Sequence, residues 1–322
     1  MIETDTLLNI LKEKNVRRVA LQFPEGLKRH APQTARALFE AGFDVVISGD
    51  ACWGACDLAL DALADADILI HFGHTPVSPE IENVIYFPYS QDIDLAVLDK
   101  AAAALGGFAK TGLVTTIQHA HQSHAMADYL RSRGLDIVLA EGSGRTPLAG
   151  QVLGCTYEAA HKENAAGAEV FLFVGTGVFH AIGVSLATKK PVYALDPYAE
   201  GAGLQEVSAD RLLRKRFVQI EKARGAESFG ILLSSKSGQA REALAKRLAA
   251  LSPKASVVLI REISEMELRN LGFDAYVNTA CPRLALDDQS RFAAPLLSPA
   301  EFEIALGLRE WEEYEIDEIK AA

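Results

Sequence analysis

Four cysteines are the side chains of this 322-residue chain that are best suited to bind a metal. Cys52 and Cys56 share the short stretch "GDACWGACDLAL", whereas Cys155 and Cys281 follow far downstream. The Cys-x-x-x-Cys spacing opens the usual radical S-adenosylmethionine motif, but Ala59 stands where the third cysteine of that motif belongs. The stretch therefore cannot hold an iron-sulfur cluster by itself, and a metal site would need thiols from elsewhere in the chain.

One strand-helix-strand unit recurs nearly three times along the chain, and each copy supplies one cysteine. The copies begin at "VRRVALQFPEGL", "KTGLVTTIQ" and "ESFGILLSSKSG", and Cys56, Cys155 and Cys281 come later in each. Short aliphatic strands that alternate with helices predict parallel sheets covered by helices. We expect an α/β fold of three pseudo-repeated αβα units, Rossmann-like and with mostly parallel sheets, around a central cluster site. The units are placed at residues 1–105, 106–210 and 211–322, the third with a C-terminal tail.

The three repeat cysteines are expected to converge, because ligands of such sheets bind beyond the carboxyl ends of the strands. Three thiolates suit zinc or an iron-sulfur cluster. Structural zinc usually takes four ligands in closely spaced pairs, a pattern that this sequence lacks. A [4Fe-4S] cluster with three protein ligands leaves one iron open for chemistry. The alternative is that the cysteines are small buried apolar residues, and Cys52, which lies outside the repeat position, is expected to pack near the site.

Composition and charge exclude several classes of function. About half of the chain is apolar (49%) and its formal net charge is -11, which argues against a nucleic-acid partner because such partners are bound by neutralising phosphates. Neither a signal peptide nor an apolar run of roughly 18 residues is visible, so we expect no membrane contact and a cytoplasmic location with reduced thiols. The basic stretch 211–224 is expected to be an amphipathic helix with a solvated face.

Ten stretches together resemble a known family and span nearly the whole chain in family order. They are "LQFPEGL", "GDACWGACDLA", "HFGHTP", "TTIQ", "GQVLGCT", "FHAIG", "DPY", "RFVQIEKAR", "SSKSGQ" and "ACPRLALDD". The sequence is thereby similar to the diphthamide-forming 3-amino-3-carboxypropyl transferases, in their archaeal form. The resemblance implies that Cys56, Cys155 and Cys281 ligate a [4Fe-4S] cluster. Trp53 departs from the tyrosine that is common at its position.

The resemblance also implies a reaction, which is the first step of diphthamide synthesis by a noncanonical radical S-adenosylmethionine enzyme. The reduced cluster would cleave the bond between sulfur and the methionine γ-carbon of S-adenosylmethionine. The 3-amino-3-carboxypropyl radical would then add to C2 of a histidine imidazole in translation elongation factor 2. The implied partners are elongation factor 2, an electron donor and a second copy of the chain in a homodimer.

Polar residues at the strand ends are expected to line the S-adenosylmethionine pocket, because backbone N–H groups ahead of a helix favour an anion. The candidates are Gln22, Gln118, Ser235, Lys236, Ser237, Gly238 and Gln239. His74 and His180 occupy matching repeat positions and are interpreted as hydrogen-bonded structural residues rather than catalytic ones. Asp287 and Asp288 are expected at the surface, and the tail "REWEEYEIDEIK" is expected to form an amphipathic helix for dimer or partner contact.

Three other readings stay open at this stage. A quinolinate-synthase-like [4Fe-4S] dehydratase has a similar plan of three units with one cluster cysteine each. A noncatalytic supporting subunit is the second, although one chain that keeps all three cysteines favours self-sufficiency. A zinc-stapled binding protein is the third, and metal analysis separates it from the other two.

Overall fold

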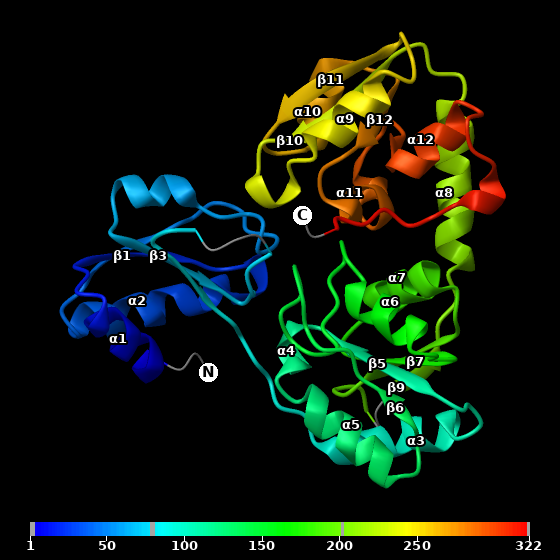
Figure 1. The fold of residues 1–322 in the computed structure, drawn as a ribbon. Coiled ribbons are helices and arrows are strands. Elements are labelled where there is room, and N and C mark those ends of the chain that lie inside the picture. The colour runs from blue at the N-terminus through cyan, green and yellow to red at the C-terminus, as the bar shows by residue number, and fades with distance from the viewer. Residues whose placement is uncertain (1–3, 78–80, 201–202, 321–322) are drawn as a thin grey trace.

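The computed structural model of the chain describes residues 4–77, 81–200 and 203–320. Three sheets of four, five and four strands build three α/β units, and the loops of all three units meet at the centre of the molecule (Figure 1). The predicted fold class is confirmed, because each unit is a mostly parallel sheet covered by helices. The longest helix, α8, has 14 residues, and no helix in the described part of the chain is long and apolar enough to cross a membrane.

The first sheet has the strand order β2-β1-β3-β4, and all its strands are parallel. Its strands are β1 (Arg18–Gln22), β2 (Asp44–Ile47), β3 (Ile68–Phe72) and β4 (Val84–Phe87). Its helices are α1 (Thr4–Glu13) and α2 (Ala31–Glu40). All five residues of β3 are buried, as expected for a parallel strand that is covered on both faces.

The second sheet has the order β6-β5-β7-β8-β9, and only its edge strand β9 is antiparallel. Its strands are β5 (Thr111–Thr115), β6 (Ile137–Val138), β7 (Val170–Val174), β8 (Val192–Asp196) and β9 (Gly203–Glu206). Its helices are α3 (Asp99–Leu105), α4 (Ile117–Ala120), α5 (Ser123–Ser132), α6 (Glu158–Ala165) and α7 (Phe179–Thr188).

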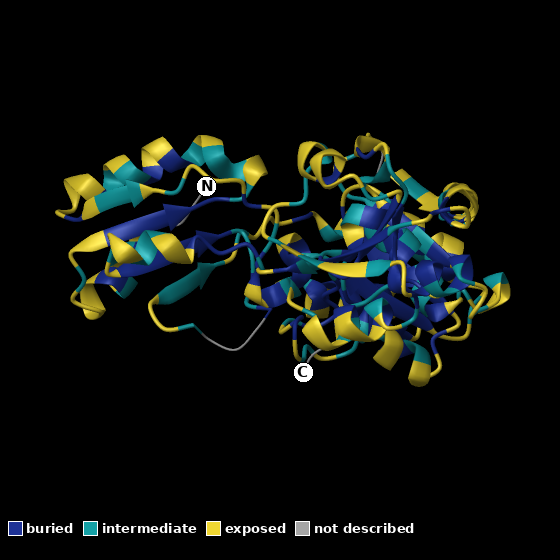
Figure 2. Cartoon of the chain, turned by 90° about the horizontal axis from the view of Figure 1, so that it is seen from above, coloured by how far each residue is buried: buried dark blue, intermediate teal, exposed yellow. Residues whose placement is uncertain are grey.

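The third sheet has the order β11-β10-β12-β13 and is parallel throughout. Its strands are β10 (Phe229–Ser234), β11 (Ala255–Ile260), β12 (Ala275–Asn278) and β13 (Leu296–Leu297). Its helices are α8 (Asp210–Ala223), α9 (Glu242–Ala249), α10 (Glu265–Leu271), α11 (Pro282–Leu286) and α12 (Pro299–Ala305). Buried strands run through the interior of each unit while helices expose one face (Figure 2).

The unit boundaries stay a prediction, and the packing of α3 bears on the first of them. Leu98, Ala101 and Leu105 pack in one cluster with Leu113 of β5 and with Met126 of α5. These helical residues therefore complete the core of the second unit, although the expected boundary follows residue 105. We propose that the first boundary lies before residue 95.

The predicted helix at the C-terminal tail is wrong. A short 3-10 helix covers Trp311–Glu313, and residues 314–320 continue without regular structure. The reason is tertiary: Ile316 and Ile319 are buried, and the backbone N–H of Ile319 donates to the carbonyl oxygen of Cys155 at 2.7 Å. A helix would use that N–H group within itself. In Figure 1 the tail runs back from the third unit to the second.

Candidate cluster site

The three repeat cysteines lie in loops beyond strand ends of three different sheets. Cys56 follows β2, Cys155 lies between β6 and α6, and Cys281 directly precedes α11, just after β12. All three line one cavity of about 230 Å³, together with Trp53 and Arg145 among others. The structure therefore brings the three predicted ligands to one place, and their role as ligands stays a proposal.

The spacing of these thiols does not suit a single zinc ion. Sulfur ligands of one zinc lie about 3.8 Å apart, since Zn–S bonds are about 2.3 Å long and tetrahedral. Among the described residues, only the side chains of Cys52, His71 and His74 bring three such donor atoms within 4.8 Å of one another. A larger group whose ligands attach at separate iron atoms fits the more open arrangement of Cys56, Cys155 and Cys281.

The electrostatics of the cavity favour a bound anion. Arg145 is 7% exposed, and its Nε has no hydrogen-bond partner among the residues described. One of its Nη atoms lies 3.1 Å from the carbonyl oxygen of Gly238 and 4.0 Å from Cys155 Sγ. A buried cation is costly without a negative partner. Three thiolates around a [4Fe-4S] core carry net negative charge, so such a group would satisfy Arg145.

Burial keeps the free thiols protonated. It raises the pKa of Cys281 to about 12, with Cys56 and Cys155 adding to the shift. Burial also raises the pKa values of Cys56 and Cys155, while the Arg145 charge opposes the shift at both. Thiolates are the metal ligands, so metal binding at this site must release protons.

The loop after β10 contributes only part of the predicted set. Lys236 is buried, with Nζ 2.9 Å from Asp57 Oδ1 and 2.7 Å from Glu262 Oε1. Gln239 donates from Nε2 to Cys56 Sγ at 3.0 Å, and Gly238 packs directly against Cys56. Ser235 and Ser237 are exposed and line none of the hollows around the cysteines.

The two predicted glutamines differ in their surroundings. Gln118 lines the cysteine cavity. Gln22 is buried, and its amide is engaged by Asp57, Ala59 and His71. Both polar atoms of the Gln22 side chain therefore already have protein partners, and Gln22 lines a small hollow with Asp57 and Glu262. Its contact with S-adenosylmethionine stays a prediction.

A second cavity of about 230 Å³ shares Trp53, Cys56, Cys281 and Arg283 with the first. Charged side chains of both signs line it; they are Asp57, Lys236, Arg261, Glu262, Arg283, Asp288 and Arg291. Such a lining suits a zwitterion. Sequence reasoning missed Arg145, Arg261 and Arg283 because isolated arginines carry no recognisable spacing, whether in a loop or, like Arg283, in a short helix.

The remaining predicted residues behave as follows. Asp287 is exposed and Asp288 partly exposed, as predicted, and they pair with Arg283 and Arg291. Cys52 is buried, as expected of a packing residue. His74 and His180 both line the cysteine cavity. His74 is hydrogen-bonded to His71, whereas His180 stacks on Phe173.

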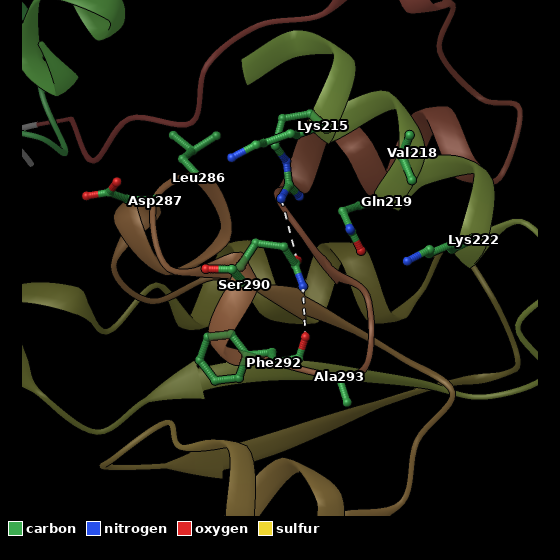
Figure 3. A pocket seen from close by; sticks show the side chains of 11 residues that line it. Lys215, Val218, Gln219, Lys222, Leu286, Asp287, Ser290, Phe292 and Ala293 are labelled. Atoms are coloured by element: carbon green, nitrogen blue, oxygen red, sulfur yellow. Dashed lines mark hydrogen bonds between the residues drawn. The ribbon is translucent and has the colours of Figure 1, made fainter. Parts of the chain in front are cut away.

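Another hollow lies on the third unit, between α8 and the segment after α11 (Figure 3). Lys215, Val218, Gln219 and Lys222 point into it from α8, and the segment 286–293 forms the other wall. The basic stretch is thus the predicted amphipathic helix, but Arg216 within it is buried rather than solvated. None of the cysteines lines this hollow, so we place the chemistry elsewhere.

The C-terminal tail forms hydrogen bonds and an ion pair that link it to the loops of Cys155 and Cys281. Glu318 accepts the backbone N–H of Tyr157 at 2.8 Å, close to Cys155. Asp317 forms an ion pair with Arg241 at 2.6 Å, and Arg241 donates to the carbonyl oxygens of Thr279 and Ala280 just before Cys281. One tail segment therefore ties the second cysteine loop to the third.

The fold and the site together define the class of protein. It is an α/β protein of three units, and each unit places one cysteine at a shared cavity. The family model described as "Putative diphthamide synthesis protein" matches residues 23–315. This chain belongs to that family.

Named relatives agree with the family over nearly the full length. The chain is 38% identical to "2-(3-amino-3-carboxypropyl)histidine synthase" of Pyrococcus horikoshii, over 99% of this chain and 93% of that protein. It is 31% identical to "2-(3-amino-3-carboxypropyl)histidine synthase subunit 1" of Homo sapiens, over 94% of this chain and 71% of that protein. The crystal structure of Dph2 from Pyrococcus horikoshii with a 4Fe-4S cluster superposes with a TM-score of 0.92 at 36% identity, covering 100% of this chain and 95% of that one.

Proposed function

We propose that this chain is a 2-(3-amino-3-carboxypropyl)histidine synthase that carries out the first step of diphthamide synthesis. It would transfer the 3-amino-3-carboxypropyl group of S-adenosylmethionine to imidazole C2 of a histidine in elongation factor 2. The observation that carries the proposal is the meeting of Cys56, Cys155 and Cys281 in one cavity, in a chain 38% identical over 99% of its length to a synthase of that name.

Cys56, Cys155 and Cys281 would hold a [4Fe-4S] cluster, and Arg145 would balance its charge. When bound, the cluster supplies the electron that cleaves the bond between sulfur and the γ-carbon. The protein contributes orientation, since the group transferred depends on which sulfonium bond is aligned. Three thiolates would leave one iron of the cluster without a protein ligand, and S-adenosylmethionine would bind at that iron.

The charged cavity is suited to hold the methionine part of S-adenosylmethionine. Arg261, Arg283 and Arg291 offer donors for the carboxylate, whereas Glu262 and Asp288 offer acceptors for the ammonium. Trp53 is 63% exposed and lines both cavities, so its ring provides a flat apolar wall on which an adenine can stack. The lining of the two cavities therefore supports S-adenosylmethionine as the substrate. The residues that would bind it are only in part those predicted from the sequence.

The proposed protein substrate is elongation factor 2, and the proposed assembly is a homodimer. An external electron donor and a cytoplasmic location are proposed with them. Exposed apolar side chains on one edge of the third unit support self-association: Val257 and Leu259 on the edge strand β11, and Met266 and Leu271 on α10. Light scattering coupled to gel filtration tests the dimer, and Leu259→Asp is expected to shift it toward monomer.

The decisive experiment is anaerobic reconstitution followed by reduction with dithionite. We expect about one [4Fe-4S] cluster per chain, methylthioadenosine from S-adenosylmethionine, and a 3-amino-3-carboxypropyl group on elongation factor 2. Cys56→Ala, Cys155→Ala and Cys281→Ala are expected to lose the cluster, whereas the matched variant Cys52→Ala keeps it. One zinc per chain would favour a binding protein, and an intact cluster that leaves S-adenosylmethionine uncleaved would favour a supporting subunit or a dehydratase.

A further inference from the structure

A chain of hydrogen bonds leads from the backbone of the first unit to the cysteine cavity, and it begins at Gln22. The Gln22 Nε2 group donates to the carbonyl oxygen of Asp57 at 2.6 Å, and Oε1 accepts the backbone N–H of Ala59 at 3.1 Å. A carbonyl cannot donate and a backbone N–H cannot accept. The orientation of the Gln22 amide is therefore determined by its two backbone partners.

That orientation determines the tautomers of two histidines. His71 Nδ1 lies 2.8 Å from Gln22 Oε1, so Nδ1 must carry the proton. Burial lowers the pKa of His71 to about 3, which leaves the ring neutral and Nε2 an acceptor. His74 Nδ1 lies 2.9 Å from His71 Nε2 and must donate to it. Burial lowers the pKa of His74 to about 4, so His74 Nε2 is also an acceptor.

The ring that carries the free acceptor borders the cysteine cavity. The His74 ring lines this cavity with Cys56, Cys155 and Cys281. No described residue donates a hydrogen bond to His74 Nε2, because its ring bonds only to His71, through Nδ1. For His180, which lines the same cavity, the described residues include no comparable partner that would set its tautomer. One ring nitrogen is thus held ready to accept a hydrogen bond at the predicted cluster site.

We propose that His74 Nε2 accepts the ring N–H of the histidine side chain that is alkylated, and so binds and orients the substrate imidazole. This inference rests on the proposed function. An imidazole that donates one ring N–H to His74 places the adjacent C2 at the same end of the ring, inside the cysteine cavity. His74 is in this role a substrate-binding residue, and His71 and Gln22 are positioning residues that act through it.

The lining of the two cavities decides which donor is expected at His74. Among the described residues, no aspartate or glutamate lines the cavity that contains His74, and the one carboxylate whose charge acts on the His74 ring, Asp57, lines the neighbouring cavity. The neighbouring cavity contains Asp57, Glu262 and Asp288, which suit the ammonium of S-adenosylmethionine. A neutral N–H donor such as an imidazole is therefore the better match for the neutral acceptor of His74.

A metal ion is the competing occupant of the histidine pair, since donor atoms of Cys52, His71 and His74 lie within 4.8 Å of one another. The 2.9 Å contact between the two rings requires a proton between them, and an ion would have to displace it. The hydrogen-bond chain accounts for that contact without a metal. We therefore favour a hydrogen bond between His71 and His74 over a shared metal ion. Metal analysis is included in the test.

The first test measures the tautomers directly on the iron-free protein. Long-range ¹H–¹⁵N correlation spectra of protein with ¹⁵N-labelled histidine, assigned with single His→Gln variants, report which ring nitrogen is protonated. We expect both His71 and His74 to be neutral with the proton on Nδ1 at neutral pH. A proton on Nε2 of His74, or one equivalent of zinc that Cys52→Ala removes, would overturn the inference.

The second test separates cleavage of S-adenosylmethionine from transfer to the protein substrate. Iron content and the methylthioadenosine formed by His74→Phe and by the parent protein are both measured, so that transfer is expressed per S-adenosylmethionine cleaved in each protein. Transfer per methylthioadenosine formed should fall about tenfold, because the substrate N–H loses its acceptor. His74→Gln, which can place an oxygen near the position of Nε2, should restore part of the coupling, and the exposed-residue variant His124→Phe serves as control.

Two results contradict the assignment, and a third contradicts the proposed function on which it rests. Unchanged coupling in His74→Phe would show that the acceptor is not used. Iron loss in both His74→Phe and His74→Gln would show a structural role instead. If the parent protein with its full cluster forms no methylthioadenosine, the proposed function itself fails, which this design distinguishes from a failure confined to His74.

Discussion

Gly238 of the third unit lies directly against Cys56 of the first unit, beside the cysteine cavity. A Cβ atom added there would lie 2.5 Å from Cys56 Cβ and 3.0 Å from Cys56 Cα. Real Cβ atoms essentially never show a contact as short as the first, and the second is unusually tight and is to a backbone atom. The absence of a side chain at Gly238 therefore allows Cys56 to take its place in the cavity.

Replacement Gly238→Ala should displace Cys56 and lower cluster content severalfold, while far-ultraviolet circular dichroism stays unchanged. Iron and sulfide per chain after anaerobic reconstitution measure the effect. Gly225→Ala is the matched control, because no atom lies within 4 Å of the Cβ that it would add. Full cluster loading in Gly238→Ala would mean that the loop yields without moving the thiol.

His161 on α6 gives a prediction about pH. Its Nε2 lies 2.8 Å from Glu318 Oε1 in the tail, and this hydrogen bond raises the pKa of His161 above its usual 6.5. A raised pKa in the folded state means that the stabilisation is complete below pH 6.5 and is lost as the pH rises through the folded value. His161 is partly exposed, so we expect less than about 1 kcal/mol.

Urea unfolding of the parent protein and of His161→Gln over a series of pH values checks this. The glutamine cannot titrate, so the difference in free energy of unfolding between the two proteins should be largest at acid pH and shrink as the pH rises. A difference that grows toward alkaline pH would contradict the assigned sign.

At the scale of elements, α8 and α12 are joined by one buried ion pair. The Arg216 and Glu301 side chains are 1% and 0% exposed, and an Nη atom of Arg216 lies 2.6 Å from Glu301 Oε2. Arg216 also donates to the carbonyl oxygens of Ala285 and Leu296, so it links four segments of the third unit. Glu301 completes the capping box of α12 with Ser298.

Removing one partner should be costly because the other stays charged and buried. Arg216→Met is expected to lower the free energy of unfolding by about 3–5 kcal/mol, measured by urea denaturation of the iron-free protein. Arg224→Met removes an exposed pair with Glu221 and should change stability by less than about 1 kcal/mol. Equal effects in the two variants would show that the burial of Arg216 does not matter.

At the scale of the whole molecule, the cysteine site is a junction of three units. Each predicted ligand comes from a different sheet, and the tail links the loops of Cys155 and Cys281 through Ile319, Asp317 and Arg241. A group bound to all three cysteines would hold the units in one arrangement. Binding to the native state alone stabilises it by mass action, so cluster loading and global stability should be coupled.

Anaerobic thermal unfolding with and without reconstituted cluster tests this coupling. We expect loading to raise the Tm of the parent protein by several degrees, and removal of iron with a chelator to reverse the rise. Cys281→Ala should match the iron-free parent and show no rise on reconstitution. A cluster that binds without changing the Tm would mean that the three units are already held together fully by their own contacts.

The strands and the repeat positions of the cysteines depend on short stretches of sequence, so the sequence alone determined them. Buried parallel strands such as β3 and β7 need continuous apolar runs, so the three sheets could be predicted, as could the repeat positions of Cys56, Cys155 and Cys281. The tail could not, because its acidic and apolar spacing fits a helix while Ile316 and Asp317 are used in long-range contacts.

Only the tertiary structure decided what the polar residues do. Gln22 anchors the His71–His74 pair, Lys236 is buried against Asp57 and Glu262, and Arg145 reaches from the second unit to the cysteines. The periodicity of a sequence determines on which face of its own helix or strand a residue lies. The partner of a polar group is set by which segments the fold brings within hydrogen-bonding distance, and no spacing along the chain records that.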